Sequence, residues 1–544
     1  MPKQITTKKF ATNVILSITA QIISLAVSFV LTLIVPKFID GTQYSHWQTY
    51  VLYVGYVGVL HFGLLDGMVL RYSKYDYNEL DKKLLRSQFV VLLTFTGICT
   101  LLMTAISAIA LGEELRLIFI FVAVGIVTKN MVTYSSYLFQ ITNRISKYVI
   151  LSIGQRVVYG LAIVLLLIIR CNDFYWYCAA DILCDCVAIC IGFVFNRGLY
   201  FGKLNPIKQT AGELRINIAS GIILMLANWS AGLLVGSAKM ITQWRWNELV
   251  FGKVAFAFSV SNVFLVFVTA ISVVLFPSLK RIDSEKLPQM YKSIRSILSP
   301  LLFFMMLFYF VGVKILELWL PDYFESLTYL GILLPIIIYS SKVSLLTNNY
   351  LKVYRKEKYM LIANAISIAL GFALFALCAY AFNNLIALLS CIVFVVMFNS
   401  VLSEIFVMRT IHVKIVKDFI IEAIMTVGFI LCASLLDLWM GFGVYCGLFA
   451  IYCAINYKSL AELFKSIGKI GKHVSANKNA VAENVTATAD ENIPIEWNAA
   501  ADESDESQTA IKHDETETDG SGEVENVDGS ETPNNEIQGE TENL

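Results

Sequence analysis

Three basic side chains fall inside long apolar stretches of the sequence, at Lys129, Arg156 and Lys342. An ionised group at such a position is energetically costly, so it usually has a function or a partner. A cation in a low-dielectric interior attracts an anion more strongly than it does in water. The predicted chemistry is therefore non-covalent binding of an anion. Lys342 is near enough to one end of its stretch to extend its ammonium to the membrane interface instead.

Few carboxylates share these stretches: Asp66, Asp181, Asp185 and Glu404. Two interpretations stay open for them. Asp181 or Asp185 could pair with a neighbouring cation and have only a structural role. Alternatively, Asp66, Asp181 and Asp185 could bind a coupling Na⁺ or H⁺. For Asp66, which precedes a glycine, a helix-end turn with a local ion pair to Arg71 is the simplest expectation.

Uncharged polar residues recur near these charges at helical spacing. In the first apolar stretch they fall within an arc of about 100° on a helix, at Asn13, Ser17, Gln21, Ser24, Ser28 and Thr32. Close packing through small residues would produce such a stripe, and so would a hydrated cavity; Asn13 and Gln21 favour the cavity. The residues predicted to line a substrate path are Lys129, Arg156, Lys342, Asn13, Gln21, Thr133, Asn228 and Asn262.

Other constellations carry no prediction of chemistry. Cys184, Cys186 and Cys190 lie beside two aspartates but lack the paired C-x-x-C spacing of a zinc site, so we expect no metal. His61 is expected to be packed rather than titrating. The sequence contains no P-loop, HExxH or GxSxG motif, which disfavours an ATPase or hydrolase. We expect a transporter rather than an enzyme, without a cofactor.

The composition indicates the elements that position these residues. The chain has 544 residues, 57% hydrophobic and 15% charged, whereas soluble domains are about 45–50% apolar and about 25% charged. One membrane crossing needs about 20 apolar residues. The sequence predicts an all-α integral membrane protein with about 14 transmembrane helices, at 10–36, 47–70, 88–111, 117–140, 148–169, 174–195, 216–236, 254–276, 297–318, 327–346, 360–382, 385–407, 419–436 and 441–457.

The distribution of charge predicts an orientation. Of the 40 Lys and Arg residues before residue 475, 30 fall in loops on the side of the N-terminus and seven on the other side. By the positive-inside rule, both termini are then cytoplasmic in a multi-pass protein of the cell membrane. The longest external loop is predicted at 237–253. Beyond residue 475 the chain has 19 acidic and two basic residues, a composition typical of a disordered tail.

A weak internal repeat relates the stretch around 44–70 to that around 251–276, about six helices later. Because six is even, the two halves keep one orientation, which is a known transporter plan. The prediction is two six-helix lobes, at 1–212 and 213–410, and then two extra transmembrane helices at 411–457. A basic and then acidic tail follows at 458–544.

The sequence resembles bacterial polysaccharide flippases of the multidrug/oligosaccharidyl-lipid/polysaccharide exporter superfamily, and in particular the O-antigen and capsule repeat-unit transporters. The likeness spans residues 8–456. Where many relatives carry an Asp-Arg pair after helix seven, this chain has Ala238 and Lys239. The residues that carry the resemblance are Asn13 to Gln21, Tyr44-Ser-His-Trp-Gln-Thr-Tyr, Phe62-Gly-Leu-Leu-Asp-Gly-Met and Phe276-Pro-Ser-Leu-Lys-Arg-Ile-Asp.

The resemblance implies two lobes around a cationic cavity and transport of a polyprenyl-diphosphate-linked oligosaccharide to the outer leaflet. The expected partners are this lipid-linked glycan and the bilayer, with no nucleic acid. Glycan-assembly proteins are an additional partner if the acidic tail docks on one. Two alternatives stay open: a cation-coupled multidrug antiporter of the same superfamily, and a non-transporting membrane scaffold that acts through its tail.

Overall fold

The computed structural model describes residues 19–73, 75, 77–142, 144–279, 285–413 and 416–457. Asn13 and the tail at 458–544 lie outside these residues. All regular secondary structure in the described part is helical. In this described part, twelve helices are long and apolar enough to cross a membrane, and two bent pairs bring the number to as many as 14. The prediction of an all-α multi-pass membrane protein is confirmed.

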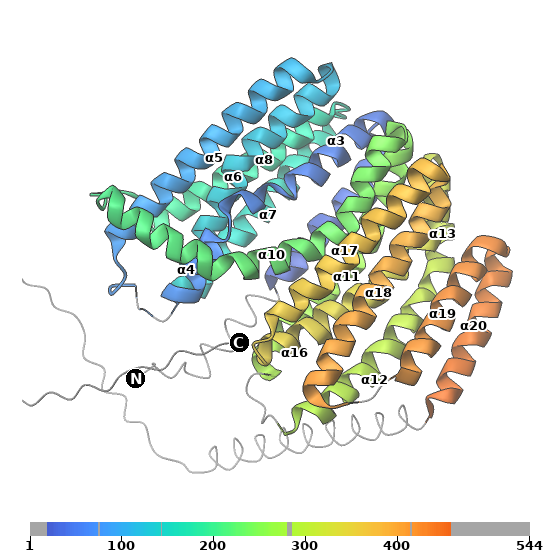
Figure 1. Cartoon of the computed structure of the whole chain (residues 1–544). Coiled ribbons are helices and arrows are strands. Elements are labelled where there is room, and N and C mark those ends of the chain that lie inside the picture. Colours follow the sequence, from blue (N-terminus) through green and yellow to red (C-terminus); the bar gives the residue numbers. More distant parts are fainter. Residues whose placement is uncertain are drawn as a thin grey trace, which may run out of the picture. The chain divides into compact units, whose positions relative to one another are not determined.

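The first group of helices ends at residue 200. Within it, α5 packs against α6, α7 against α8, and α6 against α8 (Figure 1). The first described span is Thr19–Phe38. The helices that follow are α3 (Gly41–Val54), α4 (Leu64–Tyr72), α5 (Lys82–Ala110), α6 (Glu113–Ile141), α7 (Ile145–Ile168), α8 (Phe174–Phe195) and the short α9 (Arg197–Tyr200).

The second group begins with α10 (Ile207–Arg245), which contacts both α4 of the first group and α17 of its own. Close packing also joins α11 to α14 and α17 to α18, and α19 to α20. The predicted domain boundaries at 212 and 410 stay a prediction. The other helices of this group are α11 (Glu248–Leu279), α12 (Leu287–Met306), α13 (Phe308–Trp319), α14 (Phe324–Leu333), α15 (Ile336–Lys342), α16 (Asn348–Val353), α17 (Glu357–Ala376), α18 (Leu385–Ile411), α19 (Val416–Leu435) and α20 (Leu438–Ile455).

Large apolar side chains cover the outside of the helices. On α5, Leu101 is 72% exposed and Ile109 is 88% exposed. Such a surface is unfavourable in water but matches hydrocarbon, and helices satisfy their own backbone hydrogen bonds there. The exposed apolar surface therefore agrees with a chain that crosses a bilayer many times.

Helix α10 corrects the sequence-based expectation. It runs for 39 residues to Arg245, about 58 Å at 1.5 Å per residue, and α11 begins at Glu248. The predicted external loop at 237–253 is therefore wrong. Polar residues end the apolar run near residue 236 but do not end the helix, because a helix can continue beyond the hydrocarbon core. Its last turn is held by Arg245, whose Nε donates to the backbone oxygen of Ala379 at 3.1 Å.

A sharp bend separates α3 from α4. Phe62 and Gly63 both have positive φ, at 48° and 79°, and the two helical segments are inclined by 55°. Gly67 then lets α4 approach α10 backbone to backbone, since a Cβ there would lie 1.8 Å from the carbonyl oxygen of Asn217. The spacing of Gly63 and Gly67 is that of small-residue packing between membrane helices.

Candidate functional site

A polar cavity of about 360 Å³ lies between the first group of helices and α11. Its walls come from the first span, α3, α6, α7, α8 and α11, so both groups of helices contribute. Aromatic and aliphatic side chains, such as Trp47 and Tyr159, line it together with polar ones. The polar residues that line it are Ser28, Thr32, Gln48, Lys129, Arg156, Asp181, Ser259 and Asn262.

Lys129 of α6 is held between two aspartates of α8. Its Nζ lies 2.8 Å from Oδ2 of Asp181 and 3.0 Å from Oδ2 of Asp185. The two carboxylates are one helical turn apart on α8, so they point at the same ammonium. The side chains of Lys129 and Asp181 are 25% and 17% exposed, whereas Asp185 is fully buried. We call Lys129, Asp181 and Asp185 the cavity cluster.

Neutral donors complete the cavity cluster. Asp185 accepts hydrogen bonds from Oγ1 of Thr128 at 2.9 Å and from Nε2 of Gln155 at 2.7 Å. Asp181 accepts one from the hydroxyl of Tyr50 at 2.8 Å. Buried charges need such partners to be stable. Asp185 is thus the buried, anchored member, whereas Asp181 and Lys129 reach the cavity.

Arg156 of α7 is exposed to the same cavity. Among the described residues, no carboxylate lies within ion-pair distance of its guanidinium. Lys129, Asp181 and Arg156 line the cavity, and Asp185 binds Lys129 but is fully buried. The four formal charges sum to zero, and Arg156 is the one of them that makes no ion pair among the described residues. An arginine left without a counter-ion in such a place is suited to bind an anion.

The other predicted path residues are spread over the structure. Asn262 is exposed on α11 and lines the cavity. Oγ1 of Thr133 donates to the backbone oxygen of Lys129, four residues earlier in α6, at 2.8 Å, so this hydrogen bond is local to the helix. Gln21 is half-buried and Asn228 is exposed, and neither is among the residues that line this cavity.

Lys342 does not join the cavity. It is 1% exposed and its Nζ contacts Glu404 and, at 2.6 Å, Glu422. Arg295 binds the same two carboxylates, at 3.1 Å for Glu404 and 2.8 Å for Glu422, and Asp418 at 2.7 Å. We call these five residues of α12, α15, α18 and α19 the buried cluster.

The sequence analysis missed three members of the buried cluster, Arg295, Asp418 and Glu422. Arg295 precedes the predicted membrane helix at 297–318, but in the structure it lies inside α12 and its side chain is 6% exposed. Glu422 lies inside a predicted helix, 3% exposed. The signal that could have found it is a single carboxylate in an apolar stretch, the same signal that drew attention to Glu404.

Asp66 pairs differently from the expectation. Arg71 binds Glu213 and Asn217 of α10, at 2.8 and 2.5 Å, so the expected local pair between Asp66 and Arg71 is wrong. The reason is the bend before α4, which turns this helix toward α10. Asp66 instead lies 3.8 Å from Nε2 of His61, and both side chains are buried.

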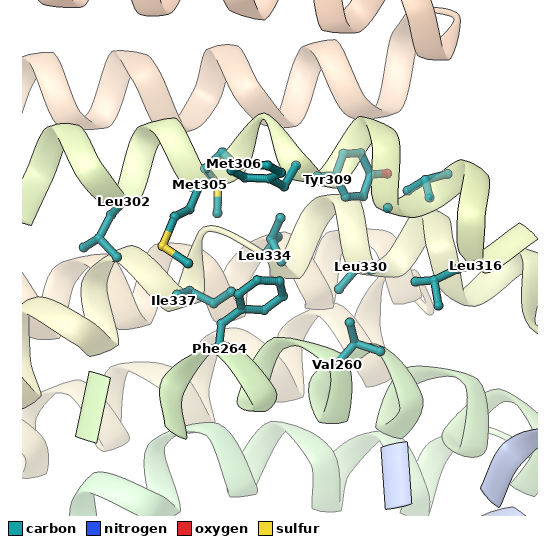
Figure 2. Close-up of a pocket in the computed structure, with 13 residues that line it drawn as sticks. Val260, Phe264, Leu302, Met305, Met306, Tyr309, Leu316, Leu330, Leu334 and Ile337 are labelled. Atoms are coloured by element: carbon teal, nitrogen blue, oxygen red, sulfur yellow. The ribbon is translucent and has the colours of Figure 1, made fainter. Parts of the chain in front are cut away.

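A second cavity lies on another side of α11. It has a volume of about 80 Å³ and is lined by apolar side chains from α11 to α15, with no charged residue among them. Figure 2 shows Phe264, Leu334 and Met305 around this space. Ser259 and Asn262 of α11 thus face the polar cavity, while Val260 and Phe264 face the apolar one.

Comparison with known proteins finds solved structures that share this fold. No family model matches the sequence, and no curated protein matches it. Among solved structures, the lipid II flippase MurJ in an inward closed conformation is similar with a TM-score of 0.58 and 11% sequence identity, over 83% of this chain and all of that one. An inward-facing multidrug resistance MATE family transporter of the MOP superfamily is similar with a TM-score of 0.55 and 11% identity, over 73% of this chain and 98% of that one.

The chain therefore has the fold of MOP superfamily transporters, as the resemblance implied. Both neighbours are transport proteins rather than enzymes. At 11% identity the likeness establishes the fold and leaves the cargo open.

Proposed function

We propose that this chain is a flippase that moves a polyprenyl-diphosphate-linked oligosaccharide from the cytoplasmic to the outer leaflet of the cell membrane by alternating access. The observation that carries the proposal is Arg156, without an acidic partner among the described residues, beside Lys129 in a polar cavity. A guanidinium binds phosphate oxygens through two parallel hydrogen bonds, and an ion pair is stronger in such a cavity than in water.

The cavity lining supports a cargo that also carries sugars. Asn262, Gln48 and Ser259 offer hydrogen-bonding groups, and Trp47 and Tyr159 offer flat apolar faces. Binding sites for small molecules commonly combine an apolar lining with a few polar groups that fix orientation. We assign the diphosphate to Arg156 and Lys129 and the sugars to the rest of the lining.

The apolar cavity on the other side of α11 supports an amphiphilic cargo. Its lining, with Phe264 and Leu334, suits part of a prenyl chain. The solved neighbour named as a lipid II flippase shows that a similar fold serves a lipid-linked cargo. The excess of basic residues in loops on the side of the N-terminus supports a cytoplasmic position for both termini.

The test uses a strain that lacks the gene and has no second flippase. We expect polyprenyl-diphosphate-linked repeat units to accumulate in the membrane and surface polymer to be lost, and expect the native gene to restore both. Arg156→Gln should fail to restore them. Lys314→Gln should restore them, because Lys314 is half exposed on α13 and pairs with its neighbour Glu317, away from the residues that line the cavity. An unchanged pool of lipid-linked glycan in the deletion strain contradicts the proposal.

A second candidate function is a cation-coupled multidrug antiporter. It is favoured by the carboxylates in the membrane, Asp66, Asp181 and Asp185, which would bind Na⁺ or H⁺, and by the similarity to a MATE family transporter. An antiporter predicts that Asp181→Asn abolishes drug efflux and that deletion of the gene leaves the lipid-linked glycan pool unchanged. The flippase predicts the opposite result for the pool.

A further inference from the structure

A histidine and two glutamates meet where α3, α6 and α11 begin, at His46, Glu114 and Glu248. Nε2 of His46 lies 2.6 Å from Oε2 of Glu248 and 3.5 Å from Oε2 of Glu114. One ligand atom from each residue lies within 4.8 Å of the other two. The three residues are 68 to 202 positions apart in the sequence, so only the fold brings them together.

The histidine is fixed, while the glutamates are free to adjust. His46 is 2% exposed and its ring packs edge-on against Phe174, with ring centroids 5.2 Å apart. Its Nδ1 has no hydrogen-bond partner among the described residues, so Nε2, which points at the carboxylates, is the nitrogen that can act. The side chains of Glu114 and Glu248 are 63% and 48% exposed, which leaves an entry path from solvent.

We propose that His46, Glu114 and Glu248 form a binding site for a divalent transition-metal ion such as Zn²⁺. Imidazole nitrogens and carboxylate oxygens are both Zn²⁺ ligands, and three protein ligands leave one position of a tetrahedral site open. Ligand atoms around tetrahedral Zn²⁺ are about 3.3 Å apart, from bond lengths of about 2.0–2.1 Å. The spacing of His46 from Glu114 already fits, and small rotations of the exposed glutamates bring Glu248 to the same distance.

The metal would tie the two groups of helices together. Glu248 belongs to α11, whereas His46 and Glu114 belong to α3 and α6. The surrounding contact is tight, since a Cβ on Gly252 of α11 would lie 2.0 Å from the hydroxyl of Ser45 of α3. A ligand that binds only one of two conformations favours that conformation by the factor 1 + [L]/Kd. Zn²⁺ at 100 times its Kd would thus favour the conformation with this contact closed about 100-fold.

The site lies on the side that the charge distribution predicts to be outside. There the ion would hold the outer ends of the helices together and act as an inhibitor of transport. Because Nδ1 has no second-shell partner, we expect affinity about 10–100-fold weaker than that of a zinc site with a complete second shell. This makes the site regulatory rather than permanently occupied. The inference does not depend on which cargo is carried.

The test is isothermal titration of the purified full-length protein in nanodiscs with ZnCl₂. We expect one saturable site in the native protein and at least 10-fold weaker binding in Glu248→Gln and in His46→Ala. Glu325→Gln is the matched control, because Glu325 is an equally exposed carboxylate that pairs with Lys253 at 2.7 Å. It should bind Zn²⁺ as the native protein does.

Thermal unfolding distinguishes a Zn²⁺ ion that links the two groups of helices from one that binds only at the surface. Zn²⁺ should raise the midpoint of thermal unfolding in the native protein and in Glu325→Gln, but not in Glu248→Gln. If His46→Ala does not fold, Glu114→Gln replaces it, because Glu114 is exposed and its loss leaves the packing intact. Equal Zn²⁺ binding by the native protein, Glu248→Gln and Glu114→Gln would overturn the proposal, and so would the absence of a saturable site.

Discussion

The cavity cluster and the buried cluster contain the same types of side chain, basic residues paired with carboxylates, but differ in their exposure to a cavity. In the cavity cluster, Lys129 is shared by two aspartates, and both Lys129 and Asp181 reach a polar cavity. In the buried cluster, Lys342 is also shared by two carboxylates, yet it is 1% exposed. A charge inside a membrane helix is therefore not by itself a sign of a binding site. A candidate binding site is distinguished by access to a cavity and by a nearby charge, such as Arg156, that has no ion-pair partner among the described residues.

We expect the buried cluster to contribute to the stability of the fold and to have no role in binding cargo. Lys342→Met leaves Glu404 and Glu422 with Arg295 as their remaining cation inside the protein. Removing one partner of a buried ion pair costs about 3–5 kcal/mol because the remaining charge is uncompensated. We expect a strong loss of thermal stability, measured by unfolding of the purified protein in detergent.

The double variant Lys342→Met/Glu422→Gln is the control for that prediction. It removes one cation and one anion, so it should recover most of the lost stability. A single variant as stable as the native protein would break the comparison, because it would show that the buried cluster does not depend on charge balance.

The cavity cluster is expected to respond less to the same change. In Lys129→Met, Asp185 keeps its hydrogen bonds from Thr128 and Gln155, and Asp181 keeps contact with the cavity. We expect a loss smaller than the cost of about 3–5 kcal/mol for a pair that is buried on all sides, because Asp181 is partly solvated through the cavity. Thermal unfolding measured side by side with Lys342→Met tests the ranking. Equal losses for the two variants would show that access to the cavity does not relieve the buried charge.

The two clusters also differ in how far the sequence could predict them. The alternative that Lys129 pairs with Asp181 or Asp185 was available from the sequence, because aspartates one helical turn apart share a face. The partners of Lys342 come instead from two different helices, α18 and α19, and Glu422 is 80 residues away. Such pairing depends on which helix faces pack together, which hydropathy does not encode.

The fold itself was more predictable than either cluster. Within the described residues, the predicted membrane segments correspond to helices or to bent pairs of helices, because the length of an apolar run is fixed by the bilayer. The bend at Gly63 and the extension of α10 to Arg245 were not predicted. The first depends on local φ values, and the second on polar residues that continue a helix beyond the hydrocarbon core.

Asp418 is the partly exposed member of the buried cluster, and its substitution tests how much such a member contributes to stability. Its carboxylate binds Arg295 at 2.7 Å but its side chain is 39% exposed, so solvent screens the pair. Exposed ion pairs contribute about 0–1 kcal/mol. Asp418→Asn should therefore lower stability by less than about 1 kcal/mol in the unfolding measurement used for Lys342→Met. A loss as large as that of Lys342→Met would mean that Arg295 needs all three carboxylates and that the cluster has no exposed edge.

Arg156 gives the smallest expected effect on stability and the clearest contrast with Lys342. No described carboxylate pairs with its guanidinium, and it faces the cavity. Substitutions at such exposed positions usually change stability by no more than about 0.5 kcal/mol. Arg156→Gln should thus unfold at the same temperature as the native protein while failing in the glycan-pool assay, and Arg156→Lys should retain part of the activity because it keeps the charge but loses the bidentate geometry. If Arg156→Gln instead lost stability as Lys342→Met does, Arg156 would belong to the structural charges, and the cavity would hold no cation reserved for cargo.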